Sequence, residues 1–294
     1  MTNPLSALAH QLASGDVVLA IALFLLASWI GYRLLQLGKV VAGSSFGDRY
    51  GQFASQVGTL LLLEQAYEFT RAQIPYRTDV ALIHGYRLLE LEWRHGFFVE
   101  SRLERFFLQF QMLMNAIDIF YVLGHLLVTT GVIIWIFFWR RQHYPFLRNL
   151  IFITTAMALV AFYLYPTAPP RMFPNYGFVD PLQLHHFVSD GGAQPNSYTY
   201  NPYAAMPSLH VAYALVVSWS LFLAERNVWV RFLAVLYPLA MSAAVVITAN
   251  HWLLDVAGAF LTVGLASLVV LALVLLQTLL YPKVMRLTLA ERNS

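Results

Sequence analysis

The 294-residue sequence contains no cysteine, which excludes disulfide bonds, thiolate metal sites and cysteine nucleophiles. Charge is also scarce: 11% of the residues are charged and 59% are hydrophobic, whereas a soluble domain has about 25% charged residues. Lys39 and Lys283 are the only lysines, and there is no basic tract or nucleic-acid-binding motif, so we expect no nucleic-acid partner. Most of the chain should therefore face lipid or other buried helices.

Long apolar runs mark the candidates for membrane-spanning helices, which need roughly 20 mostly apolar residues. These runs cover residues 17–37, 53–71, 115–139, 148–165, 206–225, 229–249 and 252–281. The run at 53–71 is the weakest, because Glu64 and Glu68 interrupt it. The first run begins near Asp16 and is too long for the apolar core of a signal peptide, so we interpret it as a signal anchor.

Two long segments between these runs are not spans. Residues 72–113 interleave arginines and glutamates with leucines and phenylalanines, which predicts one or two amphipathic helices on the membrane surface. A small extramembrane helical cap without lipid contact is the alternative. Residues 166–205 are rich in proline and glycine and predict a long structured loop, a kind of segment that is usually functional.

The sequence thus predicts an all-α fold, a polytopic membrane helical bundle of about six or seven transmembrane helices. We expect a single membrane domain over residues 1–294. Its N-terminal spans and the amphipathic surface segment occupy residues 17–113, and a catalytic helical core occupies 114–281.

Basic residues in the short loops predict the orientation of the bundle, because such loops are enriched in lysine and arginine on the cytoplasmic side. Loops 38–52, 139–147 and 226–231 each contain two lysines or arginines, whereas Arg171 is the only lysine or arginine in the long 166–205 loop. The long loop should therefore lie outside, in a multi-pass protein of the cell (inner) membrane with its active site on the extracytoplasmic side.

His251 and Asp255 begin the last span, and their spacing of four places them on one face of a helix. A carboxylate in that position can hold one ring nitrogen and leave the other free as a nucleophile or base. A buried polar contact between helices is the alternative for such a pair. Ionisable residues inside membrane spans are nevertheless functional by default.

Ser208 and His210 begin the 206–225 span, directly after Pro207. The free N–H groups of a first helical turn bind anions, and a histidine there could donate a proton to a leaving oxygen. Plain helix capping by Ser208, with His210 as an interface residue, is the alternative. Arg171 in the long loop offers a forked, permanently charged donor for phosphate oxygens.

Together these residues resemble the three motifs of the type 2 phosphatidic acid phosphatase superfamily: an arginine motif ending at Arg171, Pro-Ser-x-His ending at His210, and His-x-x-x-Asp starting at His251. The resemblance covers about residues 140–281. The Pro-Pro-Arg form of the first motif and the Asn-His-Trp form of the third are similar to the inositol phosphorylceramide synthase branch.

The resemblance implies a role for each motif residue. His251 attacks phosphorus and forms a phosphohistidine, Asp255 orients it, and His210 protonates the leaving alcohol and then activates the acceptor. Arg171, Ser208 and nearby backbone N–H groups hold the phosphoryl oxygens. The resemblance implies no cofactor and no metal ion.

The sequence departs from the phosphatase pattern where that pattern has lysine, Ser-Arg, glycine and proline; these positions are Leu164, Ala244-Val245, Leu209 and Met172. Two phosphate-binding cations are therefore missing. A phosphodiester carries less charge than a monoester and needs fewer cations, so we favour headgroup transfer to an alcohol. Plain hydrolysis of phosphatidate or a polyprenyl phosphate is the alternative.

Further polar residues are candidates for the lining of a headgroup or acceptor pocket, with an internal salt-bridge network as the alternative: Glu64, Glu68, Arg71, Asp118, His125 and Asn250. A transporter is disfavoured because the polar groups lie at one expected face and no internal repeat is visible. The intact motif residues disfavour a non-catalytic scaffold. We expect a membrane lipid as substrate; protein partners are unknown, and a homo-oligomer is compatible with the sequence.

Overall fold

The computed structural model describes residues 15–37, 45–179 and 201–292, so residues 180–200 of the expected long loop lie outside it. In this part of the chain every regular element is helical, apart from an isolated β-bridge between Thr167 and Ala204. The α-helices are α2 (Gly15–Leu37), α3 (Ser45–Gln73), α4 (Thr78–Arg94), α5 (Glu100–Phe107), α6 (Gln111–Ile119), α7 (His125–Trp139), α8 (Tyr144–Leu164), α10 (Leu209–Ala224), α11 (Val228–Ile247) and α12 (Leu253–Arg292). Shorter turns are the π-helical η1 (Phe120–Gly124) and the 3-10 turns η2 (Arg141–His143), η3 (Pro170–Met172) and η4 (Pro174–Tyr176).

The chain groups into two compact units. The first contains residues 1–75 and 191–201, and the second contains residues 76–190 and 202–294. Helices α4 and α5 therefore lie in the second unit. The single membrane domain, with its division into residues 17–113 and 114–281, stays a prediction.

In the first unit, α2 and α3 pack along one another. A Cβ on Gly58 of α3 would meet Leu26 Cγ of α2 at 2.7 Å and the Ala22 carbonyl oxygen at 3.1 Å. Glycine at this position therefore permits a closer approach than any other residue. Small residues at such contacts are typical of helix pairs in membranes.

In the second unit, α8, α10 and α12 contact one another and form the centre of the bundle, while α7 and α11 pack on α10. Ala158 of α8, Ala212 of α10 and Ala259 of α12 are fully buried. Lipid supplies no hydrophobic driving force between helices, so close packing of small residues holds such helices together.

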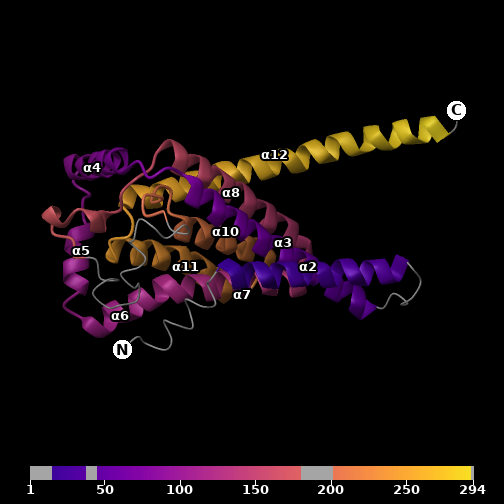
Figure 1. The fold of residues 1–294 in the computed structure, drawn as a ribbon, viewed down its shortest axis with the longest axis horizontal. Helices are drawn as coiled ribbons and strands as arrows, with labels where there is room; N and C mark the ends of the chain where they lie inside the picture. The colour runs from indigo at the N-terminus through magenta and orange to yellow at the C-terminus, as the bar shows by residue number, and fades with distance from the viewer. Residues whose placement is uncertain (1–14, 38–44, 180–200, 293–294) are drawn as a thin grey trace. The chain divides into compact units, whose positions relative to one another are not determined.

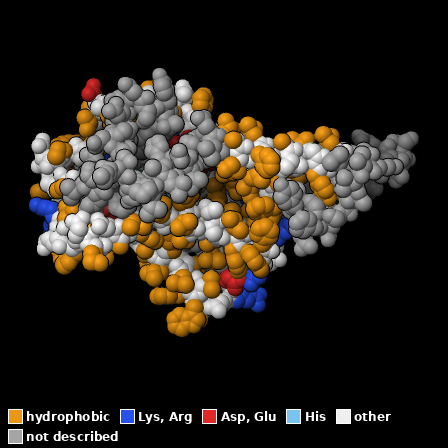
Figure 2. All heavy atoms as spheres, turned by 60° about the horizontal axis from the view of Figure 1, so that its bottom comes forward, with side chains coloured by type: hydrophobic (Ala, Val, Ile, Leu, Met, Phe, Trp, Pro, Cys, Tyr) orange, Lys and Arg blue, Asp and Glu red, His pale blue; other side chains and the backbone are white. Residues whose placement is uncertain are grey.

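The apolar surface of the molecule agrees with a membrane protein. Four helical stretches are long and apolar enough to cross a membrane, namely Gln111–Trp139, Arg141–Leu164, Val228–Ile247 and Leu253–Leu280. Two shorter apolar helices cover Leu19–Leu34 and Leu209–Ala224. On the face drawn in Figure 2, apolar side chains dominate the described surface and charged side chains are few. The all-helical membrane fold is thus confirmed, whereas the expected number of six or seven spans stays a prediction.

The amphipathic segment forms two helices, α4 and α5, which lie across the end of the bundle at which α12 begins (Figure 1). Their acidic residues do not all face outward: Glu92, Glu100 and Glu104 are fully buried. An amphipathic helix normally turns its charged residues to water, so this burial departs from the expected surface segment. Contact of α4 and α5 with a membrane surface stays a prediction.

Candidate functional site

The His-x-x-x-Asp pair forms the entrance to α12. His251 Nδ1 lies 3.3 Å from Asp255 Oδ2, which also accepts a hydrogen bond from the Trp252 backbone N–H at 2.9 Å. Both the histidine and the aspartate are buried. Because Nδ1 is held by the carboxylate, Nε2 is the ring nitrogen available for chemistry. The pairing predicted from the spacing of four is therefore present.

Arg171 reaches this turn from the loop after α8. Its backbone N–H donates to the Ala249 carbonyl oxygen at 3.0 Å, and its Nη1 donates to Asn250 Oδ1. The Asn250 amide nitrogen in turn donates to the Thr248 hydroxyl at 2.9 Å. Asn250, predicted to line a pocket, thus holds the guanidinium group beside His251.

Two contacts fix the loop that carries Arg171. Trp252 is fully buried, and its indole Nε1 donates to the Ala168 carbonyl oxygen at 2.9 Å. On the other side, a Cβ on Gly85 of α4 would meet that same oxygen at 2.7 Å and the Phe173 ring at 2.8 Å. Gly85 therefore lets α4 press directly against the backbone of the arginine loop.

The start of α10 lies against the start of α12. The Ser208 backbone N–H donates to the Asp255 carbonyl oxygen at 3.2 Å, and the rings of His210 and His251 have their centroids 6.2 Å apart. The Ser208 hydroxyl is buried and has no hydrogen-bond partner among the described residues. A buried hydroxyl without a partner is costly in the resting protein, so Ser208 Oγ is a candidate to contact a ligand.

Side chains from the π-helical turn η1 and the start of α7 pack against His210. Tyr121 stacks on the His210 ring with centroids 4.4 Å apart, and the His125 ring lies 4.8 Å from it. His125 also stacks on Tyr213, whose hydroxyl lies 2.8 Å from Thr155 Oγ1. Single π turns are frequent at functional sites. His125, predicted from the sequence as a pocket residue, therefore does reach the motif residues.

Other predicted pocket residues are placed differently. Asp118 is fully buried on α6, before the π turn. Glu64, Glu68 and Arg71 all lie on α3, in the first unit, where Arg71 and Glu68 form an ion pair at 2.6 Å. The pairing agrees with the alternative of an internal salt bridge, and a role for these three residues in substrate binding stays a prediction.

Sequence reasoning did not identify Glu92 and Glu100 as part of this region. Glu100 Oε1 accepts from the Leu253 backbone N–H, and Glu92 Oε1 accepts from that of Leu254, both at 2.9 Å. One signal could have found Glu92: it follows Leu88 by four residues, so it lies on the apolar face of α4. No sequence signal pairs it with α12.

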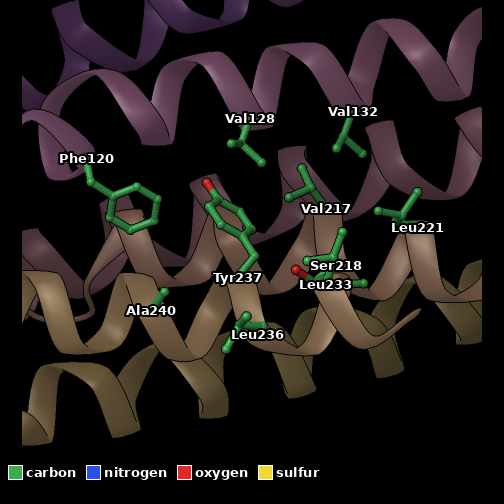
Figure 3. A pocket seen from close by; sticks show the side chains of 11 residues that line it. Phe120, Val128, Val132, Val217, Ser218, Leu221, Leu233, Leu236, Tyr237 and Ala240 are labelled. Atoms are coloured by element: carbon green, nitrogen blue, oxygen red, sulfur yellow. The ribbon is translucent and has the colours of Figure 1, made fainter. Parts of the chain in front are cut away.

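An apolar groove runs along α11 toward the site. Its deeper part has a volume of about 300 Å³ and lies between α7, α10 and α11, where Figure 3 shows Phe120 and Tyr237 among aliphatic side chains. A second cavity of about 390 Å³ shares Phe120 and Ala240 with it and extends along α11 to Ile247. The two cavities are therefore neighbours along α11.

Among the described residues, no group of three or more histidine, aspartate or glutamate side chains is arranged to hold a metal ion. A family model described as the PAP2 superfamily matches residues 86–269. The matched region runs from α4 into α12 and contains all five motif residues, Arg171, Ser208, His210, His251 and Asp255. No curated protein and no solved structure matches the chain.

Proposed function

Because the chain belongs to the PAP2 superfamily, we propose that it is an integral membrane enzyme that transfers or hydrolyses a lipid phosphate through a phosphohistidine on His251. Membership of this superfamily supports a phosphatase-type enzyme. One observation carries the specific proposal: His251 is paired with a buried carboxylate on one side and faces His210 from a different helix on the other.

The reaction has two steps. In the first, His251 Nε2 attacks phosphorus, the bond between phosphorus and the leaving oxygen breaks, and His210 gives its proton to that oxygen. In the second, neutral His210 takes the proton of the acceptor hydroxyl, whose oxygen attacks phosphorus and breaks the P–N bond. Asp255 stabilises the imidazolium form of His251 and holds its tautomer throughout.

The phosphoryl oxygens need donors placed where negative charge develops. Arg171 is one, because Asn250 and the Ala249 carbonyl hold it beside His251. The Ser208 hydroxyl is a second, since it is buried without a partner among the described residues. The backbone N–H groups in the first turn of α10 add the positive end of a helix dipole.

Headgroup transfer to an alcohol is the favoured reaction. The PAP2 phosphatase cations expected at Leu164 and Val245 are absent, and Val245 is fully buried. Arg171 alone would neutralise a doubly charged phosphate monoester poorly, whereas a singly charged phosphodiester requires less positive charge from the protein. An inositol phosphorylceramide synthase-like transfer fits this charge; plain lipid phosphate hydrolysis is the alternative.

A lipid substrate also needs a place for its hydrocarbon chains. The groove along α11 is lined almost entirely by apolar side chains and reaches Ile247 at the end of that helix, so we assign it to a chain of the substrate. The distribution of basic residues among the loops supports an active site on the extracytoplasmic side of the cell membrane.

The test uses purified protein in detergent with a panel of phospholipids and lipid phosphates. Wild type should release phosphate or form a new phospholipid, and His251→Ala should lose at least about a thousandfold of that rate. The identity of the product separates transferase from hydrolase. Equal rates for wild type and variant across the panel would refute a histidine nucleophile at this position.

A further inference from the structure

Three successive backbone N–H groups at the entrance to α12 are each held by a different carboxyl group. Trp252 donates to Asp255, Leu253 donates to Glu100 and Leu254 donates to Glu92, all at 2.9 Å. These three acidic residues are fully buried. The turn that carries His251 is therefore supported by side chains from α4, α5 and α12 itself.

Ordinary helix capping does not explain this arrangement. A capping side chain normally comes from the residue just before the helix and serves N–H groups two or three positions later. Here the carboxyl groups come from residues 153 and 162 positions away, on a different pair of helices. Burying two glutamates beside Asp255 is also unfavourable, since like charges in a low-dielectric site repel strongly. A local Ser or Asp cap would stabilise the helix at a lower cost.

Three carboxyl groups therefore lie close together, because they accept from three successive backbone N–H groups. Glu92 Oε2 is buried and has no hydrogen-bond partner among the described residues. Burial and the nearby charges of Glu100 and Asp255 raise the pKa of Glu92 above its usual range, so the neutral acid is the favoured form of Glu92.

We propose that Glu92 and Glu100 are positioning residues for the nucleophile, two buried side chains that hold the first turn of α12 so that His251 faces His210 and Arg171. This inference rests on the proposed function for its catalytic consequence, but the protonation of Glu92 can be tested without any activity. Neither glutamate touches the substrate; each acts through the backbone of Leu253 or Leu254.

The conservative variant distinguishes positioning from simple burial. Glu92→Gln keeps an oxygen for the Leu254 N–H and carries no charge, so it copies a neutral carboxylic acid. Glu92→Leu has a similar size but lacks that oxygen, which leaves the Leu254 N–H without its acceptor. We expect Glu92→Gln to retain wild-type kcat within about twofold and Glu92→Leu to lose at least about tenfold, because small misplacements of a reacting group are costly. KM should change less than kcat in both.

The first experiment measures thermal unfolding of the full-length protein in detergent from pH 5 to pH 9. Folding raises the pKa of Glu92, so between its ordinary value and its raised value the folded protein holds a proton that the unfolded chain releases. This difference in bound protons lowers the free energy of unfolding of the wild type as pH rises. Glu92→Gln has no such proton, so its melting temperature should gain on that of wild type as pH increases. Parallel curves for the two proteins would overturn the neutral state of Glu92.

The second experiment compares kcat, KM and the pH profile of the lipid reaction. Ionisation of Glu92 at high pH places a second charge beside Glu100 and Asp255, so the alkaline decline of wild-type kcat should move to higher pH in Glu92→Gln. Glu90→Gln is the matched control, because Glu90 is on the same helix but exposed and paired with Arg94. Glu90→Gln should match wild type in both experiments.

The outcomes separate the two proposals. If no variant and no wild-type preparation turns over lipid, the proposed function fails while the pH-dependent stability difference can still be present. If wild type is active and Glu92→Leu, folded by the unfolding assay, keeps full kcat, the positioning role is overturned. If Glu92→Gln loses as much kcat as Glu92→Leu, the neutral state of Glu92 is overturned.

Discussion

The starts of α10 and α12 and the α4–α5 segment both bury polar side chains at the same end of the bundle, but they satisfy them differently. In the segment, Glu104 accepts the Val179 N–H with both oxygens, at 3.2 and 3.1 Å. At the helix starts, Ser208 Oγ and Asp255 Oδ1 have no hydrogen-bond partner among the described residues, and in the segment Glu92 Oε2 has none either. Buried groups that are fully paired hold the structure, whereas unpaired ones are candidates to meet a ligand.

Asp255→Asn should lower kcat more than any other of these substitutions. The amide can donate a hydrogen bond to the His251 ring and so stabilise the wrong tautomer, which leaves Nε2 protonated and unable to attack phosphorus. We expect kcat to fall by about a thousandfold or more, by analogy with the loss of an orienting aspartate in other histidine-dependent sites. Steady-state kinetics on the active lipid measures the loss. An Asp255→Asn variant with more than a tenth of wild-type kcat would contradict the orienting role.

Ser208→Ala should lower kcat by about tenfold to a hundredfold, because it removes one hydrogen-bond donor from the developing phosphoryl charge. Its melting temperature should match or exceed that of wild type, since Ser208 Oγ makes no hydrogen bond to the described residues. Kinetics and thermal unfolding on the same preparation provide both values. A drop in stability with unchanged kcat would assign the hydroxyl to the fold.

Ala240→Phe should fill the groove at the point where its two parts meet. We expect KM for a long-chain lipid to rise by about tenfold, while a short-chain analogue of the same headgroup keeps its wild-type KM. Leu239→Phe is the control. Leu239 is the neighbour of Ala240 on α11, but its side chain is exposed and lines neither cavity. Equal changes in KM for the long-chain and short-chain lipids would show that the groove does not bind a chain of the substrate.

Glu104→Gln should have the smallest effect on catalysis and act on stability alone. The amide keeps one acceptor for the Val179 N–H but loses the charge of the carboxylate, so the free energy of unfolding should fall by about 1 kcal/mol. We expect kcat to stay within about twofold of wild type. Thermal unfolding and kinetics, measured side by side, check this; a loss of kcat with unchanged stability would place Glu104 with the catalytic residues.

Much of the fold and part of the site could be predicted because their signals are local. The apolar runs predicted α2, α6 to α8 and α10 to α12 at nearly their observed positions. The spacing of His251 and Asp255 predicted their contact, since side chains four apart share a helical face. The resemblance to the superfamily is confirmed by the family match, whereas the synthase-like branch stays a proposal.

Other features needed contacts that no periodicity encodes. No periodicity could foresee that Asn250 holds Arg171, a contact that arises because the loop after α8 lies against the turn before α12. The expected roles of Asn250 and Glu64 in a substrate pocket stay predictions. The spacing of four from Leu88 places Glu92 on the apolar face of α4, but no periodicity pairs Glu92 or Glu100 with the start of α12.

The sequence by itself determined that this protein is a membrane helical bundle with a histidine–aspartate pair at the start of its last long helix, since composition, run length and a spacing of four depend only on neighbouring residues. Only the tertiary structure decided that α4 and α5 hold that helix start. The hydrogen bonds from Leu253 to Glu100 and from Leu254 to Glu92 join residues 153 and 162 positions apart. Such contacts form because buried N–H groups need acceptors, and the packing of the whole bundle selects which acceptor reaches them.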